Sequence, residues 1–287
     1  MSLLNLKEDQ FLNIGYIIAF VFSWISIIAA FLIEGGSIVS LLSPTGFMIV
    51  ILGTLGATVM SFPLSDIKHV PKLFKVLIKN DKNDLLSLIE QIKAMSKTAR
   101  TKGILSLEKE IVDQTDIDPF TKRGLEFILD GLDPVKTREA LESDLEMMSH
   151  RHKSGAAVFE AAGGYAPTMG IIGTVMGLIN VLGQMSSNPD GLGESIAVAF
   201  ICTLYGIATA NLIWLPIAST LKMKSKEEIV RNSMIIEGLI LLQEGANPNF
   251  IEDKLKGYLS KEDLAKAGGG DSKDAKKSSG KSKKKDK

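Results

Sequence analysis

The sequence is nearly without cysteine and histidine, since its 287 residues include one Cys and three His. Cys202 lies inside an apolar run, which excludes an intrachain disulfide framework and a cysteine-rich metal site. His150 and His152 lie about 200° apart around a helix and therefore do not share one metal ion. Walker A, HExxH, GxSxG and CxxC motifs are also missing. We therefore expect a protein that is not an enzyme and that uses no metal and no cofactor.

An excess of charge of one sign is missing as well, because 33 basic residues balance 33 acidic residues. No part of the chain shows the basic face that a nucleic-acid-binding domain requires, so we expect no nucleic-acid partner. Charged residues are excluded from four apolar runs: 14–33, 41–64, 161–187 and 195–221. A bilayer core about 30 Å thick requires about 20 helical residues. We therefore predict four transmembrane helices.

Basic residues are unevenly distributed around these predicted spans. The turns 34–40 and 187–194 contain no Lys or Arg, whereas Lys68 and Lys222 follow the opposite ends of the second and fourth spans. Basic residues near membrane ends favour the cytoplasmic side. We therefore predict that both termini and the segment 65–154 are cytoplasmic.

The predicted cytoplasmic segments carry helical rather than strand patterns. Apolar residues recur at spacings of three and four: Leu85, Leu88, Ile89, Ile92, Met95 and Ala99. Asp118-Pro119 and Asp133-Pro134 are each typical of an N-cap followed by the first helical residue. The predicted fold class is an all-α membrane protein. Its parts outside the spans are a cytoplasmic N-terminus, a helical domain, C-terminal helices and a disordered Lys-rich tail: 1–13, 65–154, 222–267 and 268–287.

The predicted spans lack an ionisable side chain at depth, although a proton or sodium pathway usually needs one. The third and fourth spans instead carry faces of small and hydroxyl-bearing residues: Pro167, Gly170, Thr174 and Gly177, and Thr203, Gly206 and Ala210. Such faces allow close contact with another helix. If ions pass, a partner chain must supply the carboxylate. The alternative is ordinary hydrogen bonding of Ser and Thr within their own helix.

Several motifs resemble the flagellar motor stator family of MotA and PomA. Residues 165–178 (YAPTMGIIGTVMGL) resemble the family's third span, and residues 199–206 (AFICTLYG) resemble its fourth. Residues 99–108 (ARTKGILSLE) resemble the segment that faces the rotor, and residues 245–255 (GANPNFIEDKL) resemble the C-terminal motif. The likeness extends over about residues 10–260.

The resemblance implies a subunit that forms a homo-oligomeric ring, expected to be a pentamer, in the bacterial inner membrane. The ring would surround the single spans of two MotB-like chains. An aspartate of the MotB-like chain would bind the permeating ion, H⁺ or Na⁺, with the proton as the default expectation. Ion flow would turn the ring, and the ring would drive the rotor protein FliG.

The resemblance also assigns residues to the rotor contact. Arg100 and Glu108 would engage charged residues of FliG. Their spacing of eight corresponds to about 80° around an unbroken helix, although Gly103 lies between them. No role is assigned among three further loop acids: Glu142, Asp144 and Glu146.

Four span residues receive roles in the same way. Thr174 and Thr203 would line the ion pathway. Pro167 and Pro216 would couple ion flow to conformational change. Structural kinks without a functional role are the alternative for the two prolines.

Two other functions fit parts of the pattern. An energiser of the ExbB/TolQ type would couple ion flow to outer-membrane processes, but that type has three spans, whereas four are predicted here. A membrane scaffold without ion coupling would show no ion leak when produced together with a partner chain.

Overall fold

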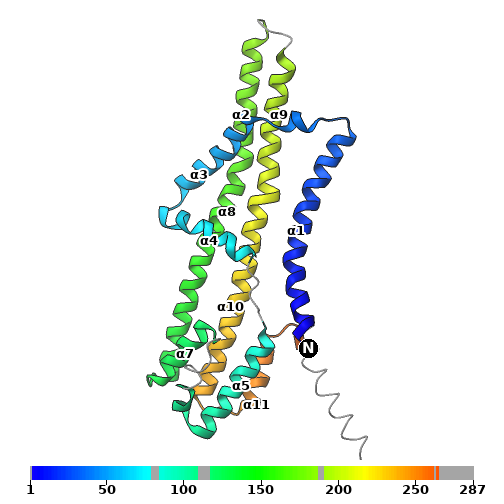
Figure 1. Ribbon diagram of the computed structural model, residues 1–287. Helices are drawn as coiled ribbons and strands as arrows, with labels where there is room; N and C mark the ends of the chain where they lie inside the picture. Colours follow the sequence, from blue (N-terminus) through cyan, green and yellow to red (C-terminus); the bar gives the residue numbers. More distant parts are fainter. Residues whose placement is uncertain (1, 79–83, 109–116, 187–190, 262, 265–287) are drawn as a thin grey trace, which may run out of the picture. The chain divides into compact units, whose positions relative to one another are not determined.

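All regular secondary structure in the described part of the chain is helical (Figure 1). The structure is a computed structural model that describes the following residues: 2–78, 84–108, 117–186, 191–261, 263 and 264. For some of these it describes the backbone alone: 2–14, 16, 17 and 78. The predicted all-α class is confirmed within these limits. The predicted Lys-rich tail, residues 268–287, lies outside the described residues.

The chain divides into two compact units. The described residues within 1–82 and 150–225 form the span unit, and those within 83–149 and 226–264 form the head unit. Two long helices, α8 and α10, contribute residues to both units. Each unit has a buried apolar cluster of its own.

Three helical segments are long and apolar enough to cross a membrane: Ile38–Ser61, Pro134–Gln184 and Leu192–Gln243. They overlap the second, third and fourth predicted spans, but the helix of the second ends at Ser61 rather than at residue 64, because Phe62 before Pro63 is extended. The first predicted span lies in α1 (Ser2–Ile33), whose apolar part with described side chains is the shorter segment Ile18–Ile33. Length and composition therefore support three of the four predicted spans among the described residues.

The second predicted span is the least regular of these segments. It consists of the 3-10 turn η1 (Ile38–Leu41), α2 (Pro44–Phe47), the π-helical turn η2 (Met48–Leu52) and α3 (Gly53–Ser61). The Ser43 hydroxyl accepts a hydrogen bond from the Gly46 N–H at 3.1 Å and caps α2. Phe62 is extended, as expected for a residue before proline, and α4 (Leu64–Ile78) follows.

Helix α8 (Pro134–Gln184) is continuous over 51 residues. It starts after the predicted cap residue Asp133, whose Oδ1 accepts from the N–H groups of Val135 and Lys136 at 3.1 Å. The hydrogen bond from the Lys136 N–H is the main cause that lowers the pKa of the Asp133 carboxyl below its usual value. The helix passes through Pro167 without a break.

The last apolar segment combines α9 (Leu192–Thr209), the π-helical turn η5 (Ala210–Trp214) and α10 (Leu215–Gln243). The Leu215 N–H donates to the carbonyl of Ala210, five residues earlier. This wider turn directly precedes Pro216, which has no N–H to donate and whose ring disfavours a tight α-turn before it. The prediction that the fourth span continues as a helix to Gln243 is confirmed.

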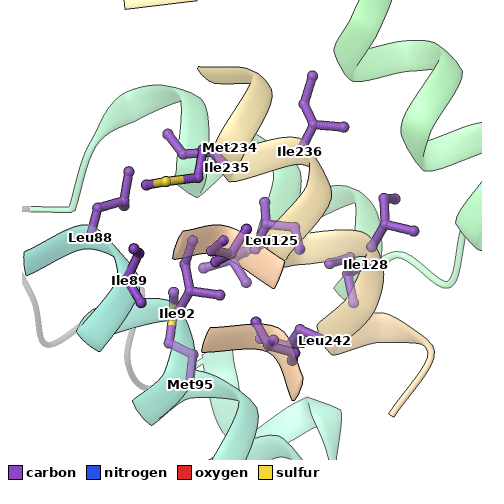
Figure 2. Close-up of a cluster of buried hydrophobic side chains, with 14 of the residues drawn as sticks. Leu88, Ile89, Ile92, Met95, Leu125, Ile128, Met234, Ile235, Ile236 and Leu242 are labelled. Atoms are coloured by element: carbon purple, nitrogen blue, oxygen red, sulfur yellow. The ribbon is translucent and has the colours of Figure 1, made fainter. Parts of the chain in front are cut away.

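The head unit buries large aliphatic side chains (Figure 2). Its short elements are α5 (Leu85–Lys102), η3 (Ile104–Ser106), α7 (Pro119–Leu129), α11 (Pro248–Leu255) and η6 (Lys256–Tyr258). The predicted apolar face of α5 is confirmed and packs against α10 and α11, in a core that includes Leu88, Ile89, Ile92, Met95, Leu125, Ile128, Met234, Ile235 and Leu242. Each such side chain contributes about 1.5–3 kcal/mol when fully buried.

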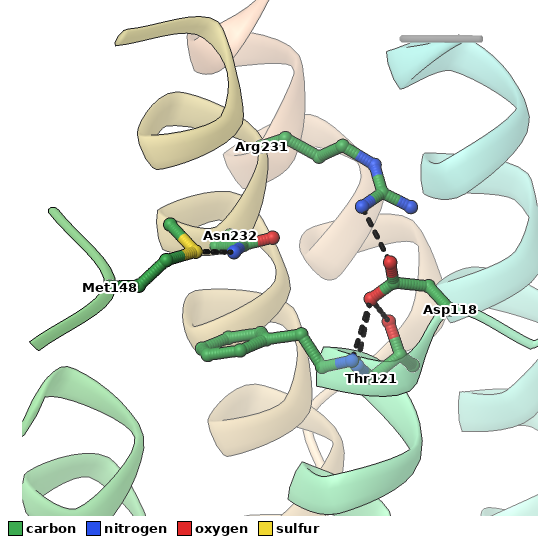
Figure 3. A network of polar contacts seen from close by, with 6 residues as sticks. Asp118, Thr121, Met148, Arg231 and Asn232 are labelled. Atoms are coloured by element: carbon green, nitrogen blue, oxygen red, sulfur yellow. Dashed lines mark hydrogen bonds and ion pairs between the residues drawn. The ribbon is translucent and has the colours of Figure 1, made fainter. Parts of the chain in front are cut away.

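A polar network centred on Asp118 connects α7 to α10 within the head unit (Figure 3). Its Oδ2 accepts from the N–H groups of Phe120 and Thr121 at 3.0 Å, which confirms the predicted cap before Pro119. Its Oδ1 lies 2.7 Å from Arg231 Nη1. Both side chains are largely buried. The ion pair therefore fixes the start of α7 against α10.

Candidate functional site

Helices α8 and α9 contact each other along the two small-residue faces predicted from the sequence (Figure 1). A Cβ on Gly206 would lie 2.6 Å from the carbonyl oxygen of Ala166 and 3.1 Å from Cα of Pro167. A Cβ on Gly170 would lie 2.8 Å from the carbonyl oxygen of Cys202. The two backbones are therefore in direct contact, which only glycine allows at these positions. The helix that approaches these glycines belongs to the same chain and brings no charge.

The hydroxyls of Thr174 and Thr203 meet in this contact and form a hydrogen bond with each other. Thr174 Oγ1 also lies 3.0 Å from the carbonyl oxygen of Ala199 and 3.1 Å from that of Gly170. A hydroxyl has one hydrogen to donate, so Thr203 can donate to Thr174 while Thr174 donates to a carbonyl. The Thr174 hydroxyl is thus within hydrogen-bonding distance both of a carbonyl of its own helix, α8, and of groups on α9. We name Gly170, Thr174, Thr203 and Gly206 the hydroxyl seam.

No Asp, Glu, Lys, Arg or His side chain lies in the described parts of the third and fourth predicted spans, residues 161–186 and 195–221. The described residues also include no group of three His, Cys, Asp or Glu side chains that could hold a metal ion. Both threonines of the seam are half-buried. Hydroxyl and carbonyl oxygens can hydrogen bond to water or contact a cation, but they do not carry a proton as a carboxylate does.

The two predicted coupling prolines lie in different local geometries. Pro167 is inside α8 and close to Gly206 of α9, whereas Pro216 follows the π-helical turn η5. The ring of Trp214, within η5, lies 6.5 Å from that of Phe159. The buried indole N–H of Trp214 has no hydrogen-bond partner among the described residues. The coupling role of the prolines stays a prediction.

Two polar contacts near the inner ends of the predicted spans were not found from the sequence. Glu160 forms an ion pair with Lys222, and both side chains are about half exposed. The Tyr165 hydroxyl lies 2.8 Å from the Ser61 hydroxyl. The sequence places these residues at span ends but contains no pattern that shows their pairing.

Arg100 and Glu108 are both exposed on the head unit. The condition of an unbroken helix from Arg100 to Glu108 is not met, because α5 ends at Lys102 and Gly103 has a φ of 85°. Such a φ is accessible to glycine and strained for other residues. The angle of about 80° expected from helical spacing therefore does not apply to this pair. Their contact with the rotor stays a prediction.

Two of the three loop acids without an assigned role form ion pairs. Glu142 Oε1 lies 3.6 Å from Arg138 Nη1, and the carboxylate of Asp144 pairs with the guanidinium of Arg123. Arg138 also donates to Glu237 at 3.0 Å, and this hydrogen bond raises the pKa of its guanidinium. The Arg138–Glu142 pair lies within α8, whereas Asp144–Arg123 joins α8 to α7 and Arg138–Glu237 joins α8 to α10.

Comparison with known proteins bears directly on this arrangement. The family model described as "MotA/TolQ/ExbB proton channel family" matches residues 112–234, and the model "Motility protein A N-terminal" matches residues 13–103. Motility protein A of Bacillus subtilis (strain 168) is 40% identical over 90% of this chain and 93% of its own length. Chemotaxis protein PomA of Vibrio alginolyticus is 33% identical over 80% of this chain and 88% of its own length.

A solved structure agrees in fold as well as in sequence. A chain of the flagellar MotAB stator complex from Bacillus subtilis superposes with a TM-score of 0.81 at 39% identity, over 87% of this chain and 97% of that chain. The resemblance inferred from the span and loop motifs is thereby confirmed. The chain belongs to the motility protein A family, within the MotA/TolQ/ExbB group of proton channels.

Proposed function

We propose that this chain is a subunit of a flagellar motor stator and that it conducts protons together with a MotB-like partner. The observation that carries the proposal is the hydroxyl seam, which is polar although the described parts of the third and fourth predicted spans contain no carboxylate and no basic side chain. A proton pathway through a bilayer usually needs an ionisable group. A carboxylate on the partner's single span would supply it. The likeness to a chain of a MotAB stator complex supports a partner of this type.

Ion passage would move a homo-oligomeric ring of this chain, which we take to be a pentamer around two MotB-like chains. One elementary charge crossing 100 mV releases about 2.3 kcal/mol. That amount is comparable to a few side-chain contacts and far below the energy of a covalent bond. Each step would therefore rearrange helix contacts. Pro167 and Pro216 lie beside the α8–α9 contact and after the π-helical turn, where such rearrangement would act.

The head unit would transmit this movement to the rotor protein FliG. Arg100 and Glu108, both exposed, supply charges of opposite sign for the contact. An exposed charge pair is weakened by salt. The contact is therefore suited to repeated formation and release.

The chain is a multi-pass protein of the inner membrane, as its apolar helices and its relatives indicate. Within the proposal it has four spans, with α1 as the first, and both termini and residues 65–154 lie in the cytoplasm. The support for this orientation is the excess of basic residues at one end of the spans.

Ion influx tests the channel directly. The chain would be produced with its MotB-like partner, from which the plug segment has been deleted, and the fall in internal pH would be followed at several sodium concentrations. We expect an influx that is independent of sodium, that Thr174→Val reduces severalfold and that Thr174→Ser largely retains. Absence of influx with the intact pair would overturn the channel. An influx that rises with sodium at fixed pH would overturn the proton assignment.

The ExbB/TolQ type of energiser fits less well. Residues 13–103, which include most of α1 and all of α5, match a family defined for motility protein A. Restored swimming of a motility-deficient strain by this chain and its partner would separate the two functions, since an energiser of outer-membrane processes would not restore it.

A further inference from the structure

A cavity of about 460 Å³ lies on the head unit at the end of α5. Its walls come from the last turns of α5, from η3 and from the end of α10, and they include Ala99, Arg100, Lys102, Leu105, Leu242 and Gln243. Small-molecule and side-chain pockets commonly have volumes of roughly 300–1,000 Å³. The cavity is therefore large enough to admit a bulky side chain.

The local backbone forms this cavity. Gly103 ends α5 with a φ of 85°, and η3 then turns across the helix end. Leu105, which lies in η3, is 74% exposed, whereas Leu242 on the opposite wall is 2% exposed. The side-chain amide of Gln243 donates to the carbonyl of Leu132, which fixes this residue in place. The result is a preformed hollow with largely apolar walls and an apolar rim.

The charge around the cavity is positive. Lys97, Arg100 and Lys102 are exposed on the last turns of α5, and none of them forms an ion pair with a residue that the structure describes. Basic residues are favourable at the C-terminus of a helix. The exposed apolar side chain of Leu105 lies close in sequence to these cations. A segment with an apolar side chain flanked by acids would complement both features.

We propose that this cavity, with Leu105 at its rim, is the docking pocket for an apolar side chain of an acidic segment of the rotor protein. Arg100 and Lys102 would pair with acids on either side of that side chain. The proposal rests on the proposed stator function and adds an apolar anchor to a contact otherwise based on charge. A buried apolar anchor is not screened by salt, and a few such residues carry most of the energy of an interface.

Binding of purified FliG from the same organism to the full chain in complex with its MotB-like partner tests this proposal. Leu105→Asn removes the apolar side chain without adding charge, and its exposed position keeps folding intact. The matched control is Val135→Asn, because Val135 is 65% exposed in the same unit and lies outside the cavity. We expect Leu105→Asn to raise Kd about tenfold and Val135→Asn to leave Kd within about twofold.

A salt series and a fluorescent label give independent measurements. The effect of Leu105→Asn should persist at high salt, whereas that of Arg100→Gln should shrink. Cys202, the only cysteine, is fully buried, so Leu105→Cys provides a single reactive thiol for an environment-sensitive dye. We expect a blue shift when FliG binds.

The possible outcomes separate the two proposals. If the unmodified complex binds FliG and Leu105→Asn binds equally well, or if the dye shows no shift, the pocket is overturned and the stator function stands. If the unmodified complex conducts protons but binds no FliG, both the pocket and the rotor contact are overturned, and the channel stands. Loss of both conduction and binding in the unmodified complex would overturn the pocket and the stator function together.

Discussion

The two units of this chain are stabilised by different kinds of contact. The head unit buries Leu, Ile and Met side chains, whereas the α8–α9 contact of the span unit brings glycine, alanine and threonine backbones together. Water drives aliphatic side chains into a core, but lipid tails are as apolar as leucine and give no such drive between helices. Close backbone packing and hydroxyl hydrogen bonds hold α8 against α9 instead, in addition to the apolar cluster around Phe159 in the same unit.

Glycines show the difference most directly. A Cβ on Gly124 of the head unit would meet the methyl of Leu239 at 2.4 Å and that of Leu141 at 3.2 Å. A Cβ on Gly206 of the span unit would meet a backbone carbonyl at 2.6 Å and Cα of Pro167 at 3.1 Å. Methyl groups at the end of a side chain can move, whereas a helix backbone can move only as a whole. One added methyl group is therefore far more disruptive at Gly206, in the α8–α9 contact, than at Gly124 in the head unit.

The largest effect is expected for Gly206→Ala. The added methyl group would force α8 and α9 apart and break the Thr174–Thr203 hydrogen bond. We expect loss of swimming and of ion influx, with the chain still detected in the membrane fraction. The control Gly183→Ala is on α8, and a Cβ there meets nothing within 4 Å. Normal swimming of the Gly206→Ala variant would show that the two helices do not need backbone contact.

Within the head unit, we expect the largest loss of stability from a substitution that leaves an empty space in the aliphatic core. Leu239 is fully buried, and Leu239→Ala should lower the free energy of unfolding by about 2–5 kcal/mol. Leu182→Ala provides the contrast, because Leu182 is 69% exposed on a predicted span. Thermal denaturation of the purified, detergent-solubilised chain measures both. Equal destabilisation by the two substitutions would contradict the distinction between an aliphatic core and a lipid-facing surface.

A polar contact of the head unit should rank next. Asp118→Ala removes the cap of α7 and leaves Arg231 without its partner, so we expect a loss of about 2–3 kcal/mol (Figure 3). Asp133→Ala removes a cap from an exposed site without leaving an unpaired ion partner and should therefore cost less than Asp118→Ala. The same denaturation measurement compares them. Equal costs would mean that the ion pair with Arg231 contributes nothing.

The smallest effect is a dependence on pH. The hydrogen bond from Lys93, followed by that from Lys256, lowers the pKa of Glu252 below its usual value of 4.5. A lowered folded-state pKa stabilises the fold above pH 4.5, and this stabilisation is lost as the pH falls through the lowered pKa. We expect about 1 kcal/mol or less. Glu252→Gln should flatten the dependence of the melting temperature on pH in this range, and an unchanged dependence would exclude this pair as its source.

Local patterns predicted the parts of the fold that depend on neighbouring residues. The buried face of α5 and the caps at Asp118 and Asp133 were predicted, because each is decided within a few positions of the chain. The ion pair between Asp118 and Arg231 joins residues 113 positions apart, and no sequence pattern indicates it.

The candidate site was predicted in the same partial way. The small-residue faces showed that a helix approaches closely, but not that the fourth span of the same chain is that helix. Thr174 and Thr203 were named, whereas their mutual hydrogen bond required the structure. Gly103 indicated a break, but the cavity beside it depends on residues of α10 that are about 140 positions away.

The π-helical turn η5 changes how the fourth span should be compared with other sequences. An α-helix advances about 100° per residue, so one additional residue in a turn shifts the phase of everything after it by roughly that angle. A helical wheel drawn evenly from Leu192 to Gln243 therefore places Pro216 on the wrong side relative to Thr203. If the π-helical turn moved by one residue along the helix, only the residue that it crossed would rotate about the helix axis. One backbone hydrogen bond would be exchanged for another. The segment thus has a means of turning a face in small increments while it remains helical throughout.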